Sequence, residues 1–250
     1  MSGPPLVIAE GLCKDFPSRR GQKVRAVDGV TFSALGGEVF GLLGVNGAGK
    51  TTTLRLLSTM LRPSAGEARV CGHSLLREAG EVRRCIGFLS AATGVYGRLT
   101  AREMVAYFGR LHGMDDRQIS QRTEELFGRL QLEAFADVRC DSLSTGNRQK
   151  VSIVRAILHD PPLLILDEAT AGLDVLASRA IVELVKDCRS RGKCVLFSTH
   201  RMDEVEALCD RVAIIHRGRL LSCSTLSEMR ARAGGGRIEE AFVAMLGEAS

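Results

Sequence analysis

Short apolar runs alternate with longer amphipathic stretches along most of the chain. Unbroken aliphatic runs of four or five residues, bounded by glycine, proline or charge, are typical of strands buried on both faces, as in a parallel sheet. Such runs are Val39–Leu43, Leu163–Leu166, Cys194–Ser198 and Val212–Ile215. Between them, Thr52–Leu61 and Arg179–Arg191 place apolar residues at helical spacing. The pattern therefore predicts an α/β fold with a mainly parallel sheet.

Two regions depart from this alternation. Leu6–Ala34 contains short alternating stretches around a turn-like segment, Pro17–Gly21, and predicts an antiparallel β subdomain at the N-terminus. From Tyr96 to Leu158 the pattern is helical, as in Glu103–Leu111 and Gln118–Leu130. We therefore expect a helical insertion over about residues 92–160.

The sequence pattern predicts that the C-terminal part of the chain is a helical tail rather than a second domain. The segment after Leu226 is helical and basic, and Gly234–Gly236 interrupts it. Ile238, Phe242 and Met245 then share one helical face and predict a helix that docks on the rest of the chain. We expect one folded unit over residues 1–225 and a helical tail over residues 226–250.

Composition narrows the class of protein. The chain has 250 residues, of which 45% are hydrophobic and 25% charged, as in ordinary globular proteins. A formal charge of +5 suits anionic ligands without indicating nucleic acid. No apolar run reaches the ~18 residues of a membrane-spanning helix, and Met1–Glu10 lacks the pattern of a secretory signal. The eight cysteines are scattered, with no C-x-x-C pair, which favours free thiols over a zinc site or a disulfide framework.

A phosphate-binding loop is predicted between the first buried strand and the following helix. The segment satisfies G-x-x-x-x-G-K-[ST] in the strand–loop–helix context that this motif requires. Its residues are Gly44, Val45, Asn46, Gly47, Ala48, Gly49, Lys50, Thr51 and Thr52. Glycines let several backbone N–H groups point into one concavity at a helix N-terminus, where they bind phosphate. Lys50 would reach the terminal phosphates and Thr51 would bind Mg²⁺, whereas the alternative is a chance glycine-rich turn.

Two carboxylates follow the buried strand Leu163–Leu166. Asp167 and Glu168 would emerge at the carboxyl end of that strand, where ligands bind in open α/β sheets. Because successive side chains alternate faces, they should play different roles. Asp167 would hold the Mg²⁺ shell and Glu168 would act as general base on the attacking water. Alone, an acidic pair could simply cap a strand.

Together with four further motifs, these residues resemble the ATP-binding subunit of an ABC transporter, over about Leu6 to Leu221. Ser144-Thr145-Gly146-Asn147 is similar to the core of the family's LSGGQ signature. Asp174 is similar to the D-loop aspartate and His200 to the switch histidine. Phe16 stands where the family places a ring that stacks on adenine. Without the family, Ser144 would be a helix N-cap, His200 a structural histidine and Phe16 a core residue.

The resemblance implies a P-loop NTPase fold and a mechanism. Two such chains would pack head to tail around two ATP molecules, so that Ser144, Thr145, Gly146 and Asn147 of each contact the ATP of the other. Asp174 would line the seam. Lys50, Glu168 and His200 would be the catalytic residues, with ATP and Mg²⁺ required.

The sequence departs from the family pattern at five positions. Thr145 replaces a glycine and Asn147 a glutamine of the signature, while Ala169 and Val45 stand where proline is usual. The glutamine that the family presents around Ala91 is absent, because Ser90–Thr93 contains none. The segment Thr93–Glu103 resembles exporters that include sodium-extruding pumps.

The sequence therefore predicts an ATP-binding and ATP-hydrolysing subunit of a membrane exporter, with sodium as candidate cargo. It would lie at the cytoplasmic face of the membrane and pair with a second nucleotide-binding subunit, as a homodimer. A polytopic permease would dock near Val95 and Tyr96, and no nucleic acid is expected. One alternative is a soluble nucleotide switch acting on ribosomes or DNA. A small-molecule kinase would leave Ser144 and Asp174 without a role.

Overall fold

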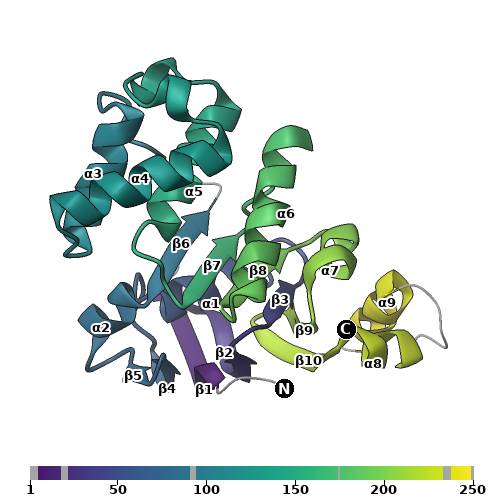
Figure 1. Cartoon of the computed structure of the whole chain (residues 1–250). Coiled ribbons are helices and arrows are strands. Elements are labelled where there is room, and N and C mark those ends of the chain that lie inside the picture. The colour runs from purple at the N-terminus through teal and green to yellow at the C-terminus, as the bar shows by residue number, and fades with distance from the viewer. Residues whose placement is uncertain (1–4, 18–21, 91–93, 174, 233–237, 249–250) are drawn as a thin grey trace.

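The structure is a computed structural model that describes residues 5–17, 22–90, 94–173, 175–232 and 238–248 (Figure 1). A six-stranded sheet forms its centre, with the strand order β10-β9-β3-β8-β7-β6. The strands are β3 (Val39–Leu43), β6 (Ile86–Ser90), β7 (Leu163–Asp167), β8 (Cys194–Thr199), β9 (Arg211–His216) and β10 (Arg219–Thr225). Only the β9–β10 pair is antiparallel. The prediction of an α/β fold with a mainly parallel sheet is confirmed.

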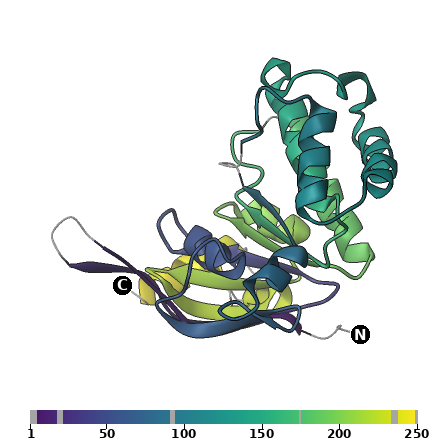
Figure 2. The same ribbon diagram turned by 90° about the vertical axis from the view of Figure 1, so that its left-hand side faces the viewer.

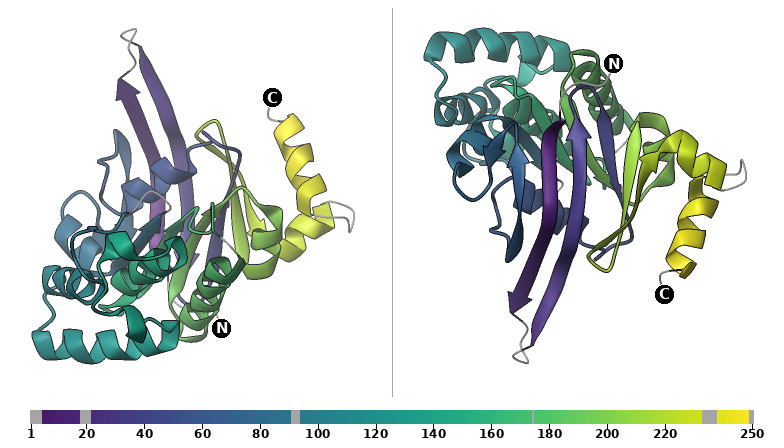
Figure 3. Two further views of the ribbon diagram at one scale, coloured as in Figure 1. Left: turned by 90° about the horizontal axis from the view of Figure 1, so that it is seen from above. Right: turned by 90° about the horizontal axis from the view of Figure 1, so that it is seen from below.

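A second, antiparallel sheet has the order β2-β1-β4-β5. It contains β1 (Pro5–Pro17), β2 (Lys23–Leu35), β4 (Ala65–Val70) and β5 (His73–Ser74). The first two strands pair along their whole length and project from the molecule as a long two-stranded ribbon (Figure 3). The N-terminal antiparallel subdomain is therefore confirmed, while β4, β5, β6 and β10 had no expected counterpart in the sequence pattern.

The parallel strands separate two hydrophobic cores. In β3, Val39 and Leu43 belong to the core under the helices, whereas Phe40 and Leu42 belong to the core shared with the antiparallel sheet. The alternation follows from the two-residue period of a strand. Burial of β3 on both faces explains why its sequence is an unbroken apolar run.

Helices cover the central sheet. They are α1 (Lys50–Leu57), α2 (Ala79–Arg84), α6 (Val175–Ser190) and α7 (Met202–Leu208). The expected bounds of two of them were wrong. The first helix begins at Lys50, directly after the glycine loop, and ends before Thr59, whose φ of 61° is incompatible with a helix. The helix expected from Arg179 begins one turn earlier, at Val175.

The helical insertion projects beyond the two sheets, and its last helix packs against β6 (Figure 2). It comprises α3 (Ala101–Leu111), α4 (Asp116–Leu130), the 3₁₀ turns Glu133–Phe135 and Cys140–Ser142, and α5 (Thr145–Ile157). Thr100 with Glu103 forms a capping box on α3, and Asp115 with Gln118 forms another on α4. Each capping box satisfies two backbone N–H groups at the start of its helix.

The tail consists of α8 (Leu226–Arg232) and α9 (Ile238–Glu248). Ile238 is fully buried and Phe242 nearly so, both in the core under the helices. Met245 packs against the same core, so the three residues share the docking face that their spacing predicts.

Among the described residues, no helix is both long and apolar enough to span a lipid bilayer. All eight cysteines are free thiols. The described part of the chain also holds no group of three or more His, Cys, Asp or Glu side chains arranged to bind a metal ion.

Candidate functional site

The glycine loop joins β3 to α1 and depends on two close backbone approaches and two positive φ angles. Gly47 and Gly49 have φ angles of 78° and 109°, which side-chain-bearing residues rarely adopt. A Cβ at Gly44 would lie 2.3 Å from the carbonyl oxygen of Ile215, and one at Gly49 would lie 2.6 Å from that of Ala26. The loop can therefore curl around a phosphate only with glycine at these positions.

Lys50 is enclosed by this loop. Its side chain is almost fully buried, and its Nζ donates to the carbonyl oxygens of Gly44, at 2.7 Å, and Val45, at 3.2 Å. The same Nζ lies 3.4 Å from Oε1 of Glu168. The ammonium group is thus fixed between the loop and the end of β7, where it can bind an anion that enters the loop.

Asp167 ends β7 and joins the P-loop to the neighbouring strand. Its Oδ1 accepts hydrogen bonds from Thr51 Oγ1 at 3.0 Å and from Ser198 Oγ at 2.8 Å. Three oxygen-bearing side chains therefore meet at one buried point. Carboxylate and hydroxyl oxygens are the ligands that Mg²⁺ prefers, so these residues fit the predicted metal position.

Glu168 and His200 lie beside this oxygen cluster. Glu168 adopts a left-handed φ of 48°, and its N–H donates to Ser198 Oγ at 3.1 Å. Nδ1 of His200 lies 3.5 Å from Glu168 Oε1, and the imidazole is about half exposed. Glu168 is partly exposed whereas Asp167 is buried, so the carboxylate of Glu168 is the more accessible of the two.

Ser198 was not predicted as a site residue, although its hydroxyl contacts both acidic positions. Its register explains this: Ser198 pairs with Asp167 across the parallel β7–β8 ladder. Aligning the two predicted strands by their amino ends would have placed it there, because Leu163 pairs with Cys194. Beyond it, Thr199 Oγ1 donates to Glu204 at 2.6 Å and Thr170 Oγ1 donates to the same carboxylate at 2.7 Å. This buried network fixes the segment that carries His200.

A cavity of about 250 Å³ opens at the carboxyl ends of β3 and β7. Its lining consists of Ala26, Asn46, Gly47, Ala48, Gly49, Lys50, Thr51, Thr52 and Glu168. The structure thus brings most of the predicted P-loop to Glu168 around one hollow, with Gly44 and Val45 contributing backbone oxygens to Lys50.

Other predicted site residues lie away from this cavity. Phe16 is partly buried in β1, belongs to neither hydrophobic core, and has Lys14 Nζ 5.4 Å from its ring centre. Ser144 is exposed and caps α5 by accepting a hydrogen bond from the N–H of Asn147 at 3.2 Å. Thr145 is also exposed and Gly146 partly so. Asp174 and Ala91 fall outside the described residues.

Comparison with known proteins identifies relatives along most of the chain. The ABC transporter family model matches residues 27–171. The chain is 42% identical to the ABC transporter ATP-binding protein NatA of Bacillus subtilis, over 82% of this chain and 84% of that protein. It is 39% identical to the Nod factor export ATP-binding protein I of Paraburkholderia xenovorans, over 86% and 71% of the respective lengths. These relatives give no support to a switch acting on ribosomes or DNA.

Solved structures agree with these relatives. An ATP-binding subunit of an ABC transporter superposes with a TM-score of 0.85 at 31% identity, covering 96% of this chain and 99% of that one. The ATP-binding cassette MJ0796, solved as a dimer in a post-hydrolysis state with ADP and Pi, superposes with a TM-score of 0.80 at 25% identity, covering 88% and 98%. The chain therefore belongs to the ATP-binding subunits of the ABC transporters, and it is an ATPase.

Proposed function

We propose that this chain drives transport by a membrane exporter, and that it does so by binding and hydrolysing ATP as a head-to-tail dimer. The observation that carries the proposal is the meeting of Lys50 and Thr51 with Asp167, Glu168 and His200 at one strand edge. A cationic glycine loop, a hydroxyl–carboxylate pair and a second carboxylate are the parts that hydrolysis of a nucleotide phosphate requires.

Each residue takes a role that its contacts allow. The N–H groups of Gly47 to Thr51 and the ammonium of Lys50 hold the phosphates, and Phe16 stacks on adenine. Thr51 and Asp167 would hold Mg²⁺, which neutralises charge on the phosphates when bound. Glu168 takes a proton from the attacking water. His200, already beside Glu168, orients that water and the γ-phosphate.

The dimer gives a role to residues that lie outside the cavity. Ser144 and Thr145 are exposed at the N-terminus of α5, where free N–H groups favour an anion. In a head-to-tail pair they and Gly146 and Asn147 would meet the ATP held by the other chain, and Asp174 would line the seam. The MJ0796 cassette was solved as a dimer, which supports the pairing of two cassettes, and we propose a homodimer.

The membrane partner is a polytopic permease, and the chain acts at the cytoplasmic face of the membrane. Export is supported by the relative named for Nod factor export, and a further relative is named for linearmycin resistance. Sodium ions are the cargo that we place first, because of the resemblance of Thr93–Glu103 to sodium-extruding pumps. Cargo differs among these relatives, so it depends on the permease rather than on the ATP site.

Glu168→Gln tests the proposal. Without a general base, hydrolysis should fall at least about a hundredfold, while ATP binding persists and dimers accumulate. Phosphate release and light scattering with ATP and Mg²⁺ measure the two effects, and Glu183→Gln on the exposed side of α6 is the matched control. A monomeric mass at saturating ATP would argue against the head-to-tail dimer, and undiminished hydrolysis would remove Glu168 from catalysis.

A further inference from the structure

Two arginines of α4 connect the helical insertion to the core. Arg122 and Arg129 lie on the same face of α4, about two helical turns apart. Nη2 of Arg129 lies 3.0 Å from Oδ2 of Asp187 in α6. Nη2 of Arg122 lies 3.1 Å from Oδ1 of Asp160, in the segment between α5 and β7. The insertion is therefore connected to the core at two points about 10 Å apart along one helix.

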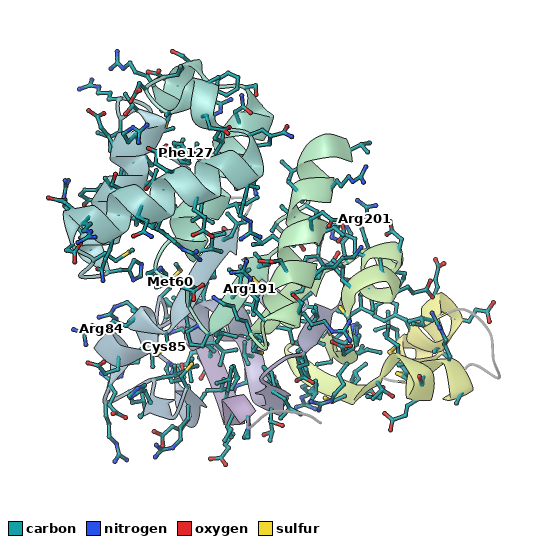
Figure 4. All side chains as sticks on the ribbon, viewed as in Figure 1. Met60, Arg84, Cys85, Phe127, Arg191 and Arg201 are labelled. Carbon is teal, nitrogen blue, oxygen red and sulfur yellow. The ribbon has the colours of Figure 1, made fainter. Side chains whose placement is uncertain are left out.

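Each of these carboxylates also binds a cation of the core. Oδ1 of Asp160 accepts from Lys193 Nζ at 2.6 Å, and Oδ1 of Asp187 accepts from Arg191 Nε at 3.2 Å. Arg191 follows α6 directly, and it is labelled in Figure 4 together with Phe127, the fully buried residue of α4 that lies between the two arginines in sequence. The core thus holds each carboxylate in place for an arginine of the insertion.

Both carboxylates are ionised near neutral pH. Burial raises the pKa of Asp160, but the hydrogen bond from Lys193 and the charge of Arg122 lower it by more, so it lies below its ordinary value. Burial likewise raises the pKa of Asp187, and the hydrogen bond and charge of Arg129 again lower it by more. The two connections are therefore ion pairs at neutral pH.

Gaps flank both ion pairs. A cavity of about 510 Å³ lies between α4, α5 and α6, with Arg129 and Asp187 in its wall. A second cavity, of about 340 Å³, has Arg122 and Asp160 in its wall. Protein interiors are normally close-packed. Because packing is incomplete at both points, the ion pairs contribute strongly to the orientation of α4 on the core.

Helix α5 transmits this orientation to the signature residues. It packs against α4, its N-cap is Ser144, and its other end leads to Asp160. Its 13 residues span about 20 Å, so a rotation of about 10° about the Asp160 end moves Ser144 by about 3 Å. A hydrogen bond to a phosphate does not survive such a shift, because its donor–acceptor distances vary by only about 0.5 Å.

We propose that Arg122 and Arg129 are positioning residues for ATP hydrolysis. Through their two ion pairs they hold the insertion in the orientation in which the signature segment, Ser144–Asn147, meets the ATP of the second chain. The inference rests on the proposed function, because the signature acts only in a dimer. Without the ion pairs the insertion samples other orientations, so the productive one is less populated and more ATP is needed to close the dimer.

The test measures the ATP concentration at which half of the chains are dimeric, by light scattering in the Glu168→Gln background. Arg129→Gln and Arg122→Gln should each raise this concentration about threefold, and the double variant about tenfold, as expected for partly exposed ion pairs. Arg129→Lys should lie closer to the parent chain than Arg129→Gln. The nucleotide affinity of the monomer, measured with a fluorescent nucleotide at a low chain concentration, should stay unchanged.

Hydrolysis gives a second readout, in chains that keep Glu168. The double variant should need about tenfold more ATP for half-maximal turnover, whereas kcat at saturating ATP should stay near that of the wild type. A purely structural role of the two arginines would not separate these two quantities.

Arg110→Gln is the matched control. Arg110 forms an exposed ion pair with Asp116, at 2.8 Å, which joins α3 to α4 inside the insertion and does not reach the core. Its loss should change the ATP requirement less than about twofold. The control therefore separates the connection between insertion and core from the general loss of a surface ion pair.

Variants of the carboxylates check that the arginines act through their ion pairs. Asp187→Asn should match Arg129→Gln, and combining the two should add little, because either change already breaks the same pair. Arg122 also pairs with Glu125 on its own helix, at 2.6 Å, so Asp160→Asn is the cleaner test of the other connection. Asn suits this position, because it tolerates the left-handed φ of 53° that Asp160 adopts.

Salt should weaken the same two connections. Raising NaCl from about 0.1 M to about 1 M shortens the screening length from about 10 Å to about 3 Å. The ATP requirement of the parent chain should therefore rise toward that of the double variant, and the difference between the two chains should shrink.

Two results would overturn the inference alone. An unchanged ATP requirement in the double variant would show that the ion pairs do not position the signature. A lowered requirement would show that they hold the insertion away from the productive orientation. If the parent Glu168→Gln chain stays monomeric at saturating ATP, the proposed function falls and takes the inference with it, so the failures are distinguishable.

Discussion

Two regions treat buried charge in opposite ways: the strand edge around Lys50, Asp167 and Glu168 (the nucleotide edge), and the groove around Arg155 between the helical insertion and β6 (the Arg155 groove). At the nucleotide edge, the buried ammonium of Lys50 faces two carbonyls and Glu168, and Asp167 accepts from two hydroxyls. In the groove, Arg155 is buried against a phenyl ring and one distant carbonyl. The first region is satisfied within the chain before any ligand arrives. The second lacks its counter-ion in the described part of the chain.

The difference indicates what each region is built to do. A site that holds its own ion pairs is preorganised, so a nucleotide exchanges one set of partners for another at little structural cost. A buried charge without a counter-ion is costly until a partner neutralises it. We therefore expect the nucleotide edge to bind ATP without the membrane partner being present.

Lys50→Ala is the strongest way to break the nucleotide edge. Removing the one buried ammonium should weaken ATP binding at least about thirtyfold, since losing one partner of a buried charged contact costs about 2 kcal/mol or more. Isothermal titration calorimetry measures the affinity, with Lys186→Ala on exposed α6 as control. Unchanged binding would remove the phosphate-loop assignment.

His159→Gln tests whether burial of His159 in the Arg155 groove makes the stability of the chain depend on pH. In the folded chain burial lowers the pKa of His159 to about 4, from about 6.5 when unfolded. Between these values the unfolded chain binds more protons, so the free energy of unfolding falls as pH drops from 6.5 to 4, by at most about 3 kcal/mol. Gln can still donate to the Ile86 carbonyl that Nε2 contacts at 3.0 Å.

Urea unfolding at pH 7.5, 6.0 and 5.0 measures the effect of this substitution. The variant should lose less stability on acidification than the wild type, while His73→Gln, in the antiparallel sheet, should follow the wild type. Parallel pH profiles for His159→Gln and wild type would show that the groove histidine stays hydrated.

Phe16→Ala has the smallest expected effect, and it tests whether Phe16 belongs to the nucleotide edge. Because Phe16 lies outside both hydrophobic cores, its loss should leave stability nearly unchanged. ATP affinity should fall several-fold, by about 1 kcal/mol, as for loss of one aromatic stack. Equilibrium binding measures this, with Phe135→Ala in the insertion as control. A destabilised chain with normal ATP affinity would return Phe16 to a packing role.

Elements with strong local patterns were predictable from the sequence. Val39–Leu43 coincides with β3, because a strand buried on both faces must be apolar throughout. By contrast, β6 was missed since Gly87 weakens its pattern. The structure shows why glycine stands there: a Cβ would lie 2.2 Å from the carbonyl oxygen of Ala156. That constraint comes from α5, far away in sequence, so no local pattern reports it.

The same distinction applies to the candidate sites. Lys50, Thr51, Asp167 and Glu168 were found because each follows a strand in a motif with fixed spacing, and the structure places them together. Arg155 was not singled out, because within α5 it reads as one polar position among apolar ones. Its burial depends on how α3 packs on α5, and only the folded chain shows that Phe108 lies against it.

The phosphate loop also depends on residues made much later in synthesis. Both neighbours of β3 in the sheet, β8 and β9, lie in the C-terminal part of the chain. The N–H of Gly218 donates to the Ala48 carbonyl oxygen at 2.8 Å, and this hydrogen bond stabilises the loop. A nascent chain that already contains Thr52 but does not yet contain Gly218 therefore carries the sequence motif, but its loop lacks the contacts that hold the folded conformation. The growing polypeptide acquires a nucleotide site only when the β9–β10 hairpin has emerged.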